Sequence, residues 1–360
     1  MKKKICIMGQ FPPPMHGLSK ALETLYNSNL NHKYDLLKVN LTNNKEILRN
    51  LHVIRKSDCD LYYLTIAQSK FGNIRDLIII KLILLKKKKI ILHLHGGGFR
   101  QLIDNEFGFV LKKLNYSILK KTDGAIVLGE SLKYIFKDIV DENKILIVKN
   151  CVDNQFVLDD LAVKEKLNQF ISKREVKILY LSNFIKDKGY EEVLTLAKYV
   201  HEKQDDRFKF VFAGKFFNSQ DEEEFFKYIN DNNLNDIVSY KGIVKGEEKT
   251  QLIKECDYFI LLTRYKNEGQ PISIIEAAVN GVRIITTNHA GIKDILDDEK
   301  MIIVDKNNIS VEKIYNLISK EYDSREEISN TCINNRSIIL NEFSEEEYIR
   351  RIDEIFSSIK

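Results

Sequence analysis

The chain has 360 residues, 44% of them apolar and 30% charged, which is the composition of a globular protein long enough for two domains. No uncharged apolar run reaches the roughly 18 residues of a membrane span, and the stretch after the N-terminal lysines is too short for a secretory signal. Five scattered cysteines without a Cys-x-x-Cys pair favour reduced thiols, a cytoplasmic protein and no structural zinc.

The net charge of +4 hides a difference between the two halves of the chain. Residues 1–150 carry 26 Lys and Arg against 13 Asp and Glu, a balance of +13, whereas residues 151–360 carry 30 against 39, a balance of −9. An anionic partner is therefore expected for the first half alone. Nucleic acid and a membrane surface both qualify, but no nucleic-acid recognition motif is present, and we expect the membrane.

The first strand is predicted at Lys4–Met8. It leads into a loop, Gly9–Gly17, that holds three of the four prolines of the chain, and a helix is predicted to open near Leu18. A stiff loop before a helix start can present N–H groups to an anion, although a simple strand-to-helix turn has the same composition. A dinucleotide site is poorly supported because the loop lacks Gly-x-Gly-x-x-Gly.

A helix is predicted within Ile74–Lys89, with an apolar body that ends in the lysines Lys86 to Lys89. One interpretation is a helix packed on a sheet with a charged end. The other adds contact between these lysines and anionic lipid, where each is worth about 1 kcal/mol near the surface. Further lysines at Lys112, Lys113, Lys120 and Lys121 are expected to add to this contact.

A buried strand is predicted to end in His95, directly before three glycines at Gly96–Gly98. Sheets of parallel strands bind ligands just outside the carboxyl ends of the strands, and glycine lets the backbone approach a ligand closely. His95 is therefore a candidate functional residue, and His93 is assigned to the core. Metal binding by the two histidines is disfavoured, on the expectation that their side chains point to opposite faces of the strand.

Further strands are predicted at Asp123–Gly129, Lys144–Asn150, Val176–Asn183, Phe208–Gly214 and Ile237–Val244, and a helix at Glu191–Glu202. The tail has helical spacing of apolar residues, at Phe343, Tyr348, Ile349, Ile352, Ile355 and Phe356. Alternating strands and helices in each half predict an α/β protein with two doubly wound, Rossmann-like domains and a cleft between them. The domains are expected at 1–155 together with the helix at about 343–360, and at 156–342.

The most informative stretch is Asn267–Gly281, which follows an apolar strand at Tyr258–Leu262. Pro271 suits the first position of a helix, and Gly281 suits its C-terminal stop. The N–H groups of Ile272 and Ser273 would then lack partners and could receive a phosphate. Glu268 before the helix and Glu276 within it would lie on either side of that phosphate. A plain strand–loop–helix connection with two incidental acids is the alternative.

The segment Glu-Gly-Gln-Pro-Ile-Ser-Ile-Ile-Glu at 268–276, followed by Ala-Ala-Val-Asn-Gly-Val-Arg-Ile-Ile-Thr-Thr, resembles the donor-site signature of retaining GT-B glycosyltransferases of family 4. The resemblance covers nearly the whole chain. It implies that Glu268 contacts the donor sugar, that Glu276 holds the nucleotide ribose, and that amides near Gly269, Gln270, Ile272 and Ser273 meet the diphosphate. It also implies that the C-terminal helix crosses back to the N-terminal domain.

The same resemblance implies roles for residues elsewhere in the chain. Gly17 would lie over the diphosphate, with His16 in place of the usual second glycine; His95 would line the cleft near the sugar and acceptor. Lys188 matches the lysine that clamps the diphosphate, and Asn183 stands where an arginine is common. The nucleobase would lie near the loops after two strands, at Gly214 and Val244. Cys151 replaces the usual glycine of the linker motif at 150–156.

The resemblance implies a retaining, metal-independent hexosyltransferase without a cofactor, which moves a sugar from a nucleotide sugar, with UDP expected, to a growing and lipid-linked glycan of a bacterial surface polysaccharide. We expect it in the cytoplasm and on the inner leaflet of the cell membrane. A catalytically silent nucleotide-sugar-binding subunit is one alternative, favoured by Asn183. An NAD(P)-dependent oxidoreductase of Rossmann fold is the other, and it lacks its glycine fingerprint.

Overall fold

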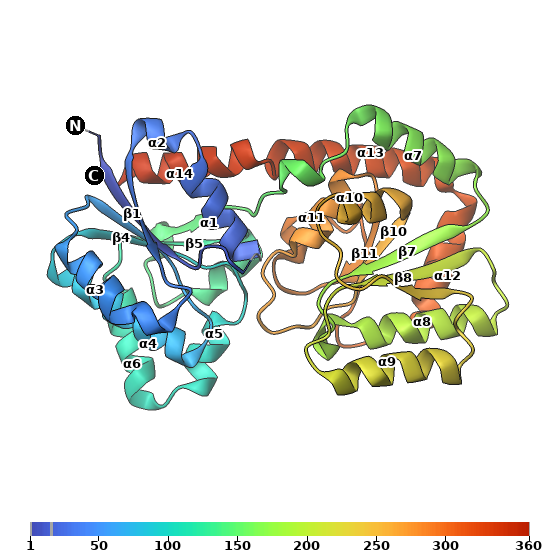
Figure 1. The fold of residues 1–360 in the computed structure, drawn as a ribbon, viewed down its shortest axis with the longest axis horizontal. Coiled ribbons are helices and arrows are strands. Elements are labelled where there is room, and N and C mark those ends of the chain that lie inside the picture. The colour runs from blue at the N-terminus through green and yellow to red at the C-terminus, as the bar shows by residue number, and fades with distance from the viewer. Residues whose placement is uncertain (1, 15–16, 360) are drawn as a thin grey trace. The chain divides into compact units, whose positions relative to one another are not determined.

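The computed structural model describes residues 2–14 and 17–359 and divides them into two compact units (Figure 1). Unit 1 comprises residues 1–151, 267–270 and 345–360, and unit 2 comprises residues 152–266 and 271–344. Each unit contains one six-stranded sheet, and every strand pair in both sheets is parallel. The predicted α/β fold with two Rossmann-like domains is confirmed.

The sheet of unit 1 has the order β2-β1-β3-β4-β5-β6. Its strands are β1 (Lys4–Gly9), β2 (Asp35–Asn40), β3 (Leu61–Thr65), β4 (Lys89–His93), β5 (Gly124–Val127) and β6 (Ile145–Ile147). Its helices are α1 (Gly17–Asn27), α2 (Leu30–Lys33), α3 (Ile47–Lys56), α4 (Lys70–Leu85), α5 (Phe99–Gln101), α6 (Phe109–Leu119) and α14 (Glu345–Ser358).

The sheet of unit 2 has the order β12-β11-β10-β7-β8-β9. Its strands are β7 (Val176–Leu181), β8 (Phe208–Ala213), β9 (Val238–Tyr240), β10 (Tyr258–Leu261), β11 (Arg283–Thr287) and β12 (Ile302–Val304). Its helices are α7 (Asp160–Ser172), α8 (Tyr190–Glu202), α9 (Ser219–Asp231), α10 (Gly246–Glu255), α11 (Ile272–Val279), α12 (Val311–Asp323) and α13 (Arg325–Glu342).

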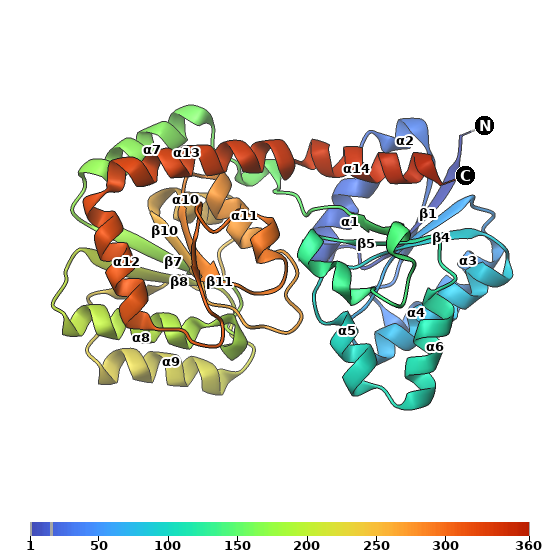
Figure 2. The same cartoon turned by 180° about the vertical axis from the view of Figure 1, so that it is seen from behind.

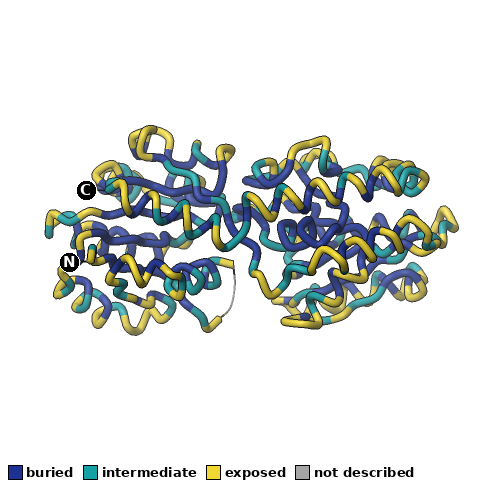
Figure 3. The backbone as a smooth tube through the Cα atoms, turned by 90° about the horizontal axis from the view of Figure 1, so that it is seen from above, coloured by how far each residue is buried: buried dark blue, intermediate teal, exposed yellow. Residues whose placement is uncertain are grey.

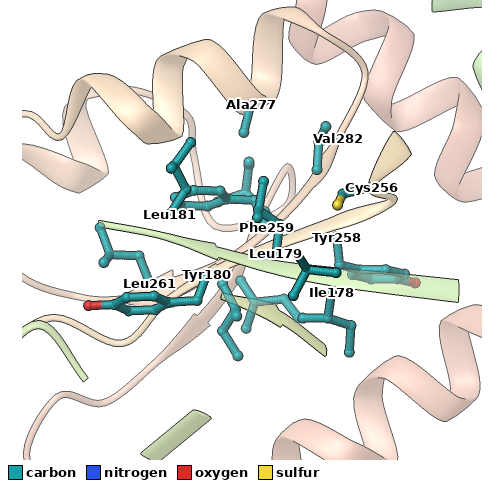
Figure 4. Packing of buried hydrophobic residues seen from close by; sticks show 14 of the residues in the cluster. Ile178, Leu179, Tyr180, Leu181, Cys256, Tyr258, Phe259, Leu261, Ala277 and Val282 are labelled. Carbon is teal, nitrogen blue, oxygen red and sulfur yellow. The ribbon is translucent and has the colours of Figure 1, made fainter. Parts of the chain in front are cut away.

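The strands of both sheets are nearly continuous apolar runs because helices cover both faces of a parallel sheet. In each unit the tube through the strands is buried, and exposed residues lie on the outer turns and loops (Figure 3). In unit 2, β7 and β10 lie at the centre of the sheet. Side chains from both strands pack together, among them Leu179, Tyr180 and Phe259, with Ala277 of α11 close by (Figure 4).

The C-terminal helix α14 belongs to unit 1, as the fold prediction required (Figure 2). Tyr348, Ile352 and Phe356 are buried in the core of unit 1 beside Tyr63 and Ile91. The Asp353 carboxylate accepts hydrogen bonds from Lys33 Nζ at 2.8 Å and from the Tyr34 hydroxyl at 2.7 Å. The last segment of the chain therefore completes the domain that its first segment begins.

Several predicted boundaries differ from the structure. The helix expected within residues 74–89 begins at Lys70, because the Ser69 hydroxyl caps it by accepting a hydrogen bond from Gly72 N, and it ends at Leu85. The strand expected at residues 144–150 covers only Ile145–Ile147. None of the helices in the described residues is both long enough and apolar enough to cross a membrane.

Candidate functional site

In unit 2 the loops after β7 and β10 carry most of the predicted site residues. These two strands are neighbours in the sheet, although β8 and β9 lie between them in the sequence. From β7 the chain continues to β8, on the side of the sheet that ends in β9. From β10 it continues to β11, on the side that ends in β12. A crevice for ligands forms at such a switch point, outside the carboxyl ends of the strands.

The helix after β10 starts one residue later than predicted. Pro271 has φ −62° and ψ 115°, so it is the extended residue that precedes helix α11 rather than its first helical residue. The N–H groups of Ile272 and Ser273 donate to no acceptor among the described residues. The two N–H groups at the start of α11 are therefore available to an anion, and their role in donor binding stays a prediction.

Glu276 lies inside unit 2, with only 3% of its surface exposed. Its Oε1 atom is 2.6 Å from Lys249 Nζ. Burial raises the pKa of the Glu276 carboxyl, and the Lys249 ammonium opposes that rise. Lys249 also lies 4.1 Å from the centre of the Phe156 ring. The sequence gave no signal for Lys249, because it lies on a charged surface helix, α10, without a motif.

Lys188 lies at the end of a short turn between β7 and α8, and hydrogen bonds tie this turn to the chain after β10. Arg264 N donates to Asp187 O at 2.7 Å, and Lys188 Nζ lies 5.0 Å from the centre of the Tyr265 ring. Gly189 has φ +84°, and a Cβ there would lie 2.4 Å from Leu262 O. Glycine at this position therefore permits the contact that brings Lys188 beside the start of the 263–270 loop.

The other residues predicted in unit 2 lie in different surroundings. Asn183 is exposed directly after β7. Gly214, which follows β8, has φ +146°, and a Cβ there would lie 1.8 Å from Ser182 O, so no side chain fits. Val244 is buried in the core of unit 2. A donor role for Val244 would therefore involve its backbone.

In unit 1, His95 and Glu268 lie on two loops in direct contact. A Cβ on Gly269 would lie 2.8 Å from His95 O, and a Cβ on Gly96 would lie 2.8 Å from Asn267 O. Gly97 N donates to Asn267 O at 3.4 Å. Glu268 is 7% exposed. The glycines that the sequence singled out as sites of close approach thus bring two loops of the protein together.

Gln270 is fixed by Asn150, a residue that the sequence did not single out. The Gln270 Oε1 accepts a hydrogen bond from Asn150 N at 3.1 Å, and Gln270 O accepts one from Asn150 Nδ2 at 2.9 Å. Gln270 Nε2 is a buried donor without an acceptor in the described residues. An N–H group of this kind is costly unless a ligand or water accepts its hydrogen bond. The linker motif at 150–156 was the available signal for Asn150.

The prediction that His93 and His95 point to opposite faces is wrong. Their rings lie 4.0 Å apart between centroids and are inclined by only 33°. Side chains alternate along an extended chain, so residues two positions apart share a face, and the two rings lie side by side for that reason. His93 is fully buried, as expected, and its Nδ1 is hydrogen-bonded to the Tyr63 hydroxyl. Burial lowers the pKa of His93 well below its usual value, so this imidazole is neutral.

Gly17 is exposed at the first position of helix α1. The predicted replacement of a glycine by His16 lies outside the described residues. Within residues 2–14 and 17–359, no group of three or more His, Cys, Asp or Glu side chains is arranged to hold a metal ion.

Comparison with known proteins finds a family match in the second half of the chain. Residues 163–335 match the family described as glycosyl transferases group 1. Over 62% of its length, the chain is 27% identical to an uncharacterized 41.2 kDa protein in the cps region of Klebsiella pneumoniae. It is 22% identical over 59% of its length to the 2-deoxystreptamine N-acetyl-D-glucosaminyltransferase of Niallia circulans. The chain spans 59% and 54% of the lengths of these two curated relatives.

The fold is that of solved glycosyltransferases. The crystal structure of Anabaena Alr3699/HepE in complex with UDP superposes with a TM-score of 0.76 at 14% identity. The superposition covers 99% of this chain and 100% of that one. At this identity the likeness establishes the two-domain GT-B fold.

The Lys249–Glu276 pair generates a prediction about stability. Replacing Lys249 by Met leaves a buried carboxylate without its partner, and we expect the free energy of unfolding at neutral pH to fall by about 3 kcal/mol. The folded-state pKa of Glu276, already raised, rises further above its unfolded value. The folded protein then binds more protons, so the loss should shrink as the pH falls toward about 5. Urea denaturation at several pH values measures both effects.

The matched control is the double variant Lys249→Met/Glu276→Gln, which removes both charges. It should regain most of the lost stability and show no added pH dependence. Equal stability of Lys249→Met and the parent protein at neutral pH would contradict a structural role for the pair.

Proposed function

We propose, from the membership of residues 163–335 in the glycosyl transferases group 1, that this protein is a retaining hexosyltransferase with a nucleotide-sugar donor. UDP is the expected nucleotide, since the related Anabaena structures contain UDP and UDP-glucose. The family match leaves the oxidoreductase alternative without support. The observation that carries the proposal is the start of α11. Its two amides, which have no acceptor in the described residues, lie within five residues of Glu268 and within four of Glu276 in the sequence.

The donor is proposed to bind with its diphosphate at these amides. The dipole of α11 and the ammonium of Lys188 would offset the phosphate charge. The Glu276 carboxylate would accept hydrogen bonds from the ribose hydroxyls. One of its oxygens already accepts a hydrogen bond from Lys249, which keeps the buried carboxylate charged and oriented. The buried Nε2 of Gln270 is a further donor for an oxygen of the ligand.

The proposed reaction exchanges one bond at the anomeric carbon for another. The bond to the diphosphate oxygen breaks, and its electron pair leaves with the diphosphate. The acceptor hydroxyl forms the new bond on the same face, and its proton passes to the departing phosphate oxygen. Negative charge grows on the diphosphate as the bond breaks, so Lys188 and the α11 amides stabilise the transition state more than the ground state. Glu268 and His95 are assigned to the sugar.

No metal is needed in this scheme, because a lysine and a helix start take the place of a cation at the leaving group. Asn183 provides no charge where related proteins often have an arginine, and this favours the alternative of a silent nucleotide-sugar-binding subunit. Transfer or donor hydrolysis by the purified protein distinguishes the two.

The acceptor is proposed to be a lipid-linked saccharide of a bacterial surface polysaccharide, at the cytoplasmic leaflet of the membrane. The relative encoded in a cps region of Klebsiella pneumoniae supports a role in polysaccharide synthesis. The +13 balance of residues 1–150 supports an anionic surface as a partner, because a donor held mainly by unit 2 does not account for it.

The proposal is tested by a thermal-shift panel of UDP, GDP and ADP and their sugars, followed by an assay for transfer or hydrolysis of the best donor. A ligand at 100 times its dissociation constant should stabilise the protein by about 2.7 kcal/mol. The expected result is stabilisation by one nucleotide and its sugar, with release of that nucleotide on incubation. A protein that no nucleotide stabilises would contradict the proposal.

Glu276 is expected to determine the affinity for the nucleotide, and Glu268 is expected to determine kcat. Glu276→Gln should weaken binding of the free nucleotide by about 10-fold or more, since a charged acceptor of hydrogen bonds is worth about 1.5–3 kcal/mol. Glu268→Gln should leave nucleotide binding near the parent value and lower kcat. Calorimetry with the nucleotide and initial rates measure the two. Unchanged nucleotide binding by Glu276→Gln would refute its ribose assignment.

Lys188→Ala should lower donor affinity and kcat together, because the charge that it meets grows in the transition state. The matched control is Lys186→Ala, which removes a lysine two residues away. Lys186 is exposed and pairs with Glu191 and Glu224, so its loss should leave both constants unchanged. Steady-state kinetics compare the two variants, and parent-like turnover in Lys188→Ala would refute the electrostatic role.

A further inference from the structure

Unit 1 exposes an apolar surface on the side of its sheet covered by α3, α4 and α6 (Figure 1). We call it the α4–α6 face, and its apolar members are Phe71, Ile74, Ile78, Phe109, Val110 and Leu114. Phe71 is 85% exposed, Phe109 79% and Val110 80%. Phe71, Ile74 and Ile78 are spaced three and four residues apart, so they form one stripe along α4. Large side chains gathered in this way mark an interaction surface.

The apolar residues of the two helices share one face because α4 and α6 are neighbours. Asn73 of α4 and Asn115 of α6 exchange two buried hydrogen bonds, of 2.8 and 3.1 Å. Asn73 and Asp76 of α4 are buried, whereas Phe71, Ile74 and Ile78 are exposed on its outer side. A surface helix usually presents mainly polar residues to water, so three large apolar side chains on this side are unusual. Helix α4 therefore carries apolar residues for a partner outside the unit.

The charge on this side of unit 1 is of one sign. Across α3, α4 and α6 the only acidic residue is Asp76, which is buried and ion-paired with Arg75. Eight exposed cations in or directly after these helices pair with no carboxylate in the described residues: Arg49, Arg55, Lys56, Lys70, Lys81, Lys113, Lys120 and Lys121. By contrast, α14 on the other side of the sheet begins with three glutamates (Figure 2).

The lysines singled out by the sequence, Lys86 to Lys89, are mostly occupied within the protein. Lys86 Nζ donates to the carbonyl oxygens of Ile54 and Ser57, Lys88 pairs with Asp58, and Lys89 pairs with Asp123. The membrane contact was expected from this cluster together with Lys112, Lys113, Lys120 and Lys121. Lys112 pairs with Asp104, and the other three are among the eight exposed cations named above.

We propose that the α4–α6 face docks on a bilayer that contains anionic lipid, with its apolar side chains in the headgroup region and its cations against the lipid phosphates. Docking would bring the enzyme to a lipid-linked acceptor, so its biological purpose rests on the proposed function. Binding to the bilayer itself does not require a bound nucleotide sugar. Apolar side chains within a cationic rim are the features of a surface that binds such a membrane.

Two other occupants fit the observations less well. In a two-fold dimer the same patch meets itself, which would bring eight cations against eight with no acidic partner. A nucleic acid would match the charge, but it gains nothing from exposed Ile and Val side chains, since its bases stack on aromatic rings. Both remain outcomes of the test.

The chain has no tryptophan, so one introduced indole reports on a single position. Phe109→Trp places it on the α4–α6 face, and Phe217→Trp places it at another exposed phenylalanine, in unit 2. Vesicles of phosphatidylcholine with increasing phosphatidylglycerol are added to the full chain. The emission of Phe109→Trp should shift to the blue as the anionic fraction rises, and that of Phe217→Trp should not. A shift at both positions or at neither would overturn the proposal.

Co-sedimentation with the same vesicles separates the apolar contribution from the charged one. Phe71→Ser/Val110→Ser should lower the partition coefficient by about 10-fold or more, and its matched control is Leu161→Ser in unit 2. Lys81→Ser/Lys113→Ser should weaken binding mainly at low salt, compared with Lys227→Ser/Lys254→Ser in unit 2. Equal effects of face and control variants would overturn the assignment of the surface.

The remaining outcomes identify the other occupants or refute the docking. Equal binding to neutral vesicles would exclude the anionic requirement. A dimer that the Phe71→Ser/Val110→Ser variant dissociates would assign the face to a second copy, and duplex DNA that displaces bound vesicles would favour nucleic acid. Thermal shifts with the nucleotide on the same samples show whether the donor site is intact. A failure to bind vesicles with normal nucleotide binding therefore rejects the docking and leaves the donor proposal standing.

Discussion

The parallel pairing of β7 with β10 is the constraint on which the candidate donor site depends. Ile178 pairs with Tyr258 and Leu179 with Phe259, although 80 residues separate the members of each pair in the chain. This register places the turn that carries Lys188 beside the chain that leads to Glu268 and α11. The hydrogen bond between Arg264 N and Asp187 O and the close approach of Gly189 to Leu262 then fix the two loops to each other. A parallel pair at the centre of a sheet is buried on both faces, so this geometry is held by the core of unit 2.

The buried carboxylate of Glu276 shows how the fold keeps a polar group ready for a ligand. A carboxylate almost wholly removed from water tends to take up a proton, and burial raises its pKa accordingly. Lys249 offsets part of that cost through a contact of 2.6 Å. A neutral acid would accept hydrogen bonds from hydroxyl groups less strongly than a charged carboxylate. In the proposed donor site, Lys249 would therefore act on the ligand through Glu276, without being in any sequence motif.

The sequence predicted the fold well because a parallel sheet requires continuous apolar strands separated by helices, and both patterns are local. It predicted the start of α11 to within one residue, at Pro271 in place of Ile272, since a proline and a following apolar run mark it. It could not predict Lys249 or Asn150, which act through residues that are distant in the sequence. The proximity of His93 and His95 was predictable, because residues two positions apart on an extended strand share a face. The roles assigned to the site residues remain predictions.

The two sides of unit 1 differ in a way that residue counts alone did not reveal. The sequence placed the membrane contact at Lys86 to Lys89 together with four lysines further on, but Lys86, Lys88 and Lys89 serve carbonyl and carboxylate groups of the protein. Eight exposed cations that pair with no carboxylate in the described residues lie in or directly after α3, α4 and α6, where the exposed apolar residues are. Helix α14 comes from the acidic second half of the sequence and packs on the opposite side of the sheet, which concentrates negative charge there. The C-terminal helix therefore completes the core of unit 1 and also adds to the difference in charge between the two sides of its sheet. The side opposite α14 carries both the exposed cations of α3, α4 and α6 and the exposed apolar residues.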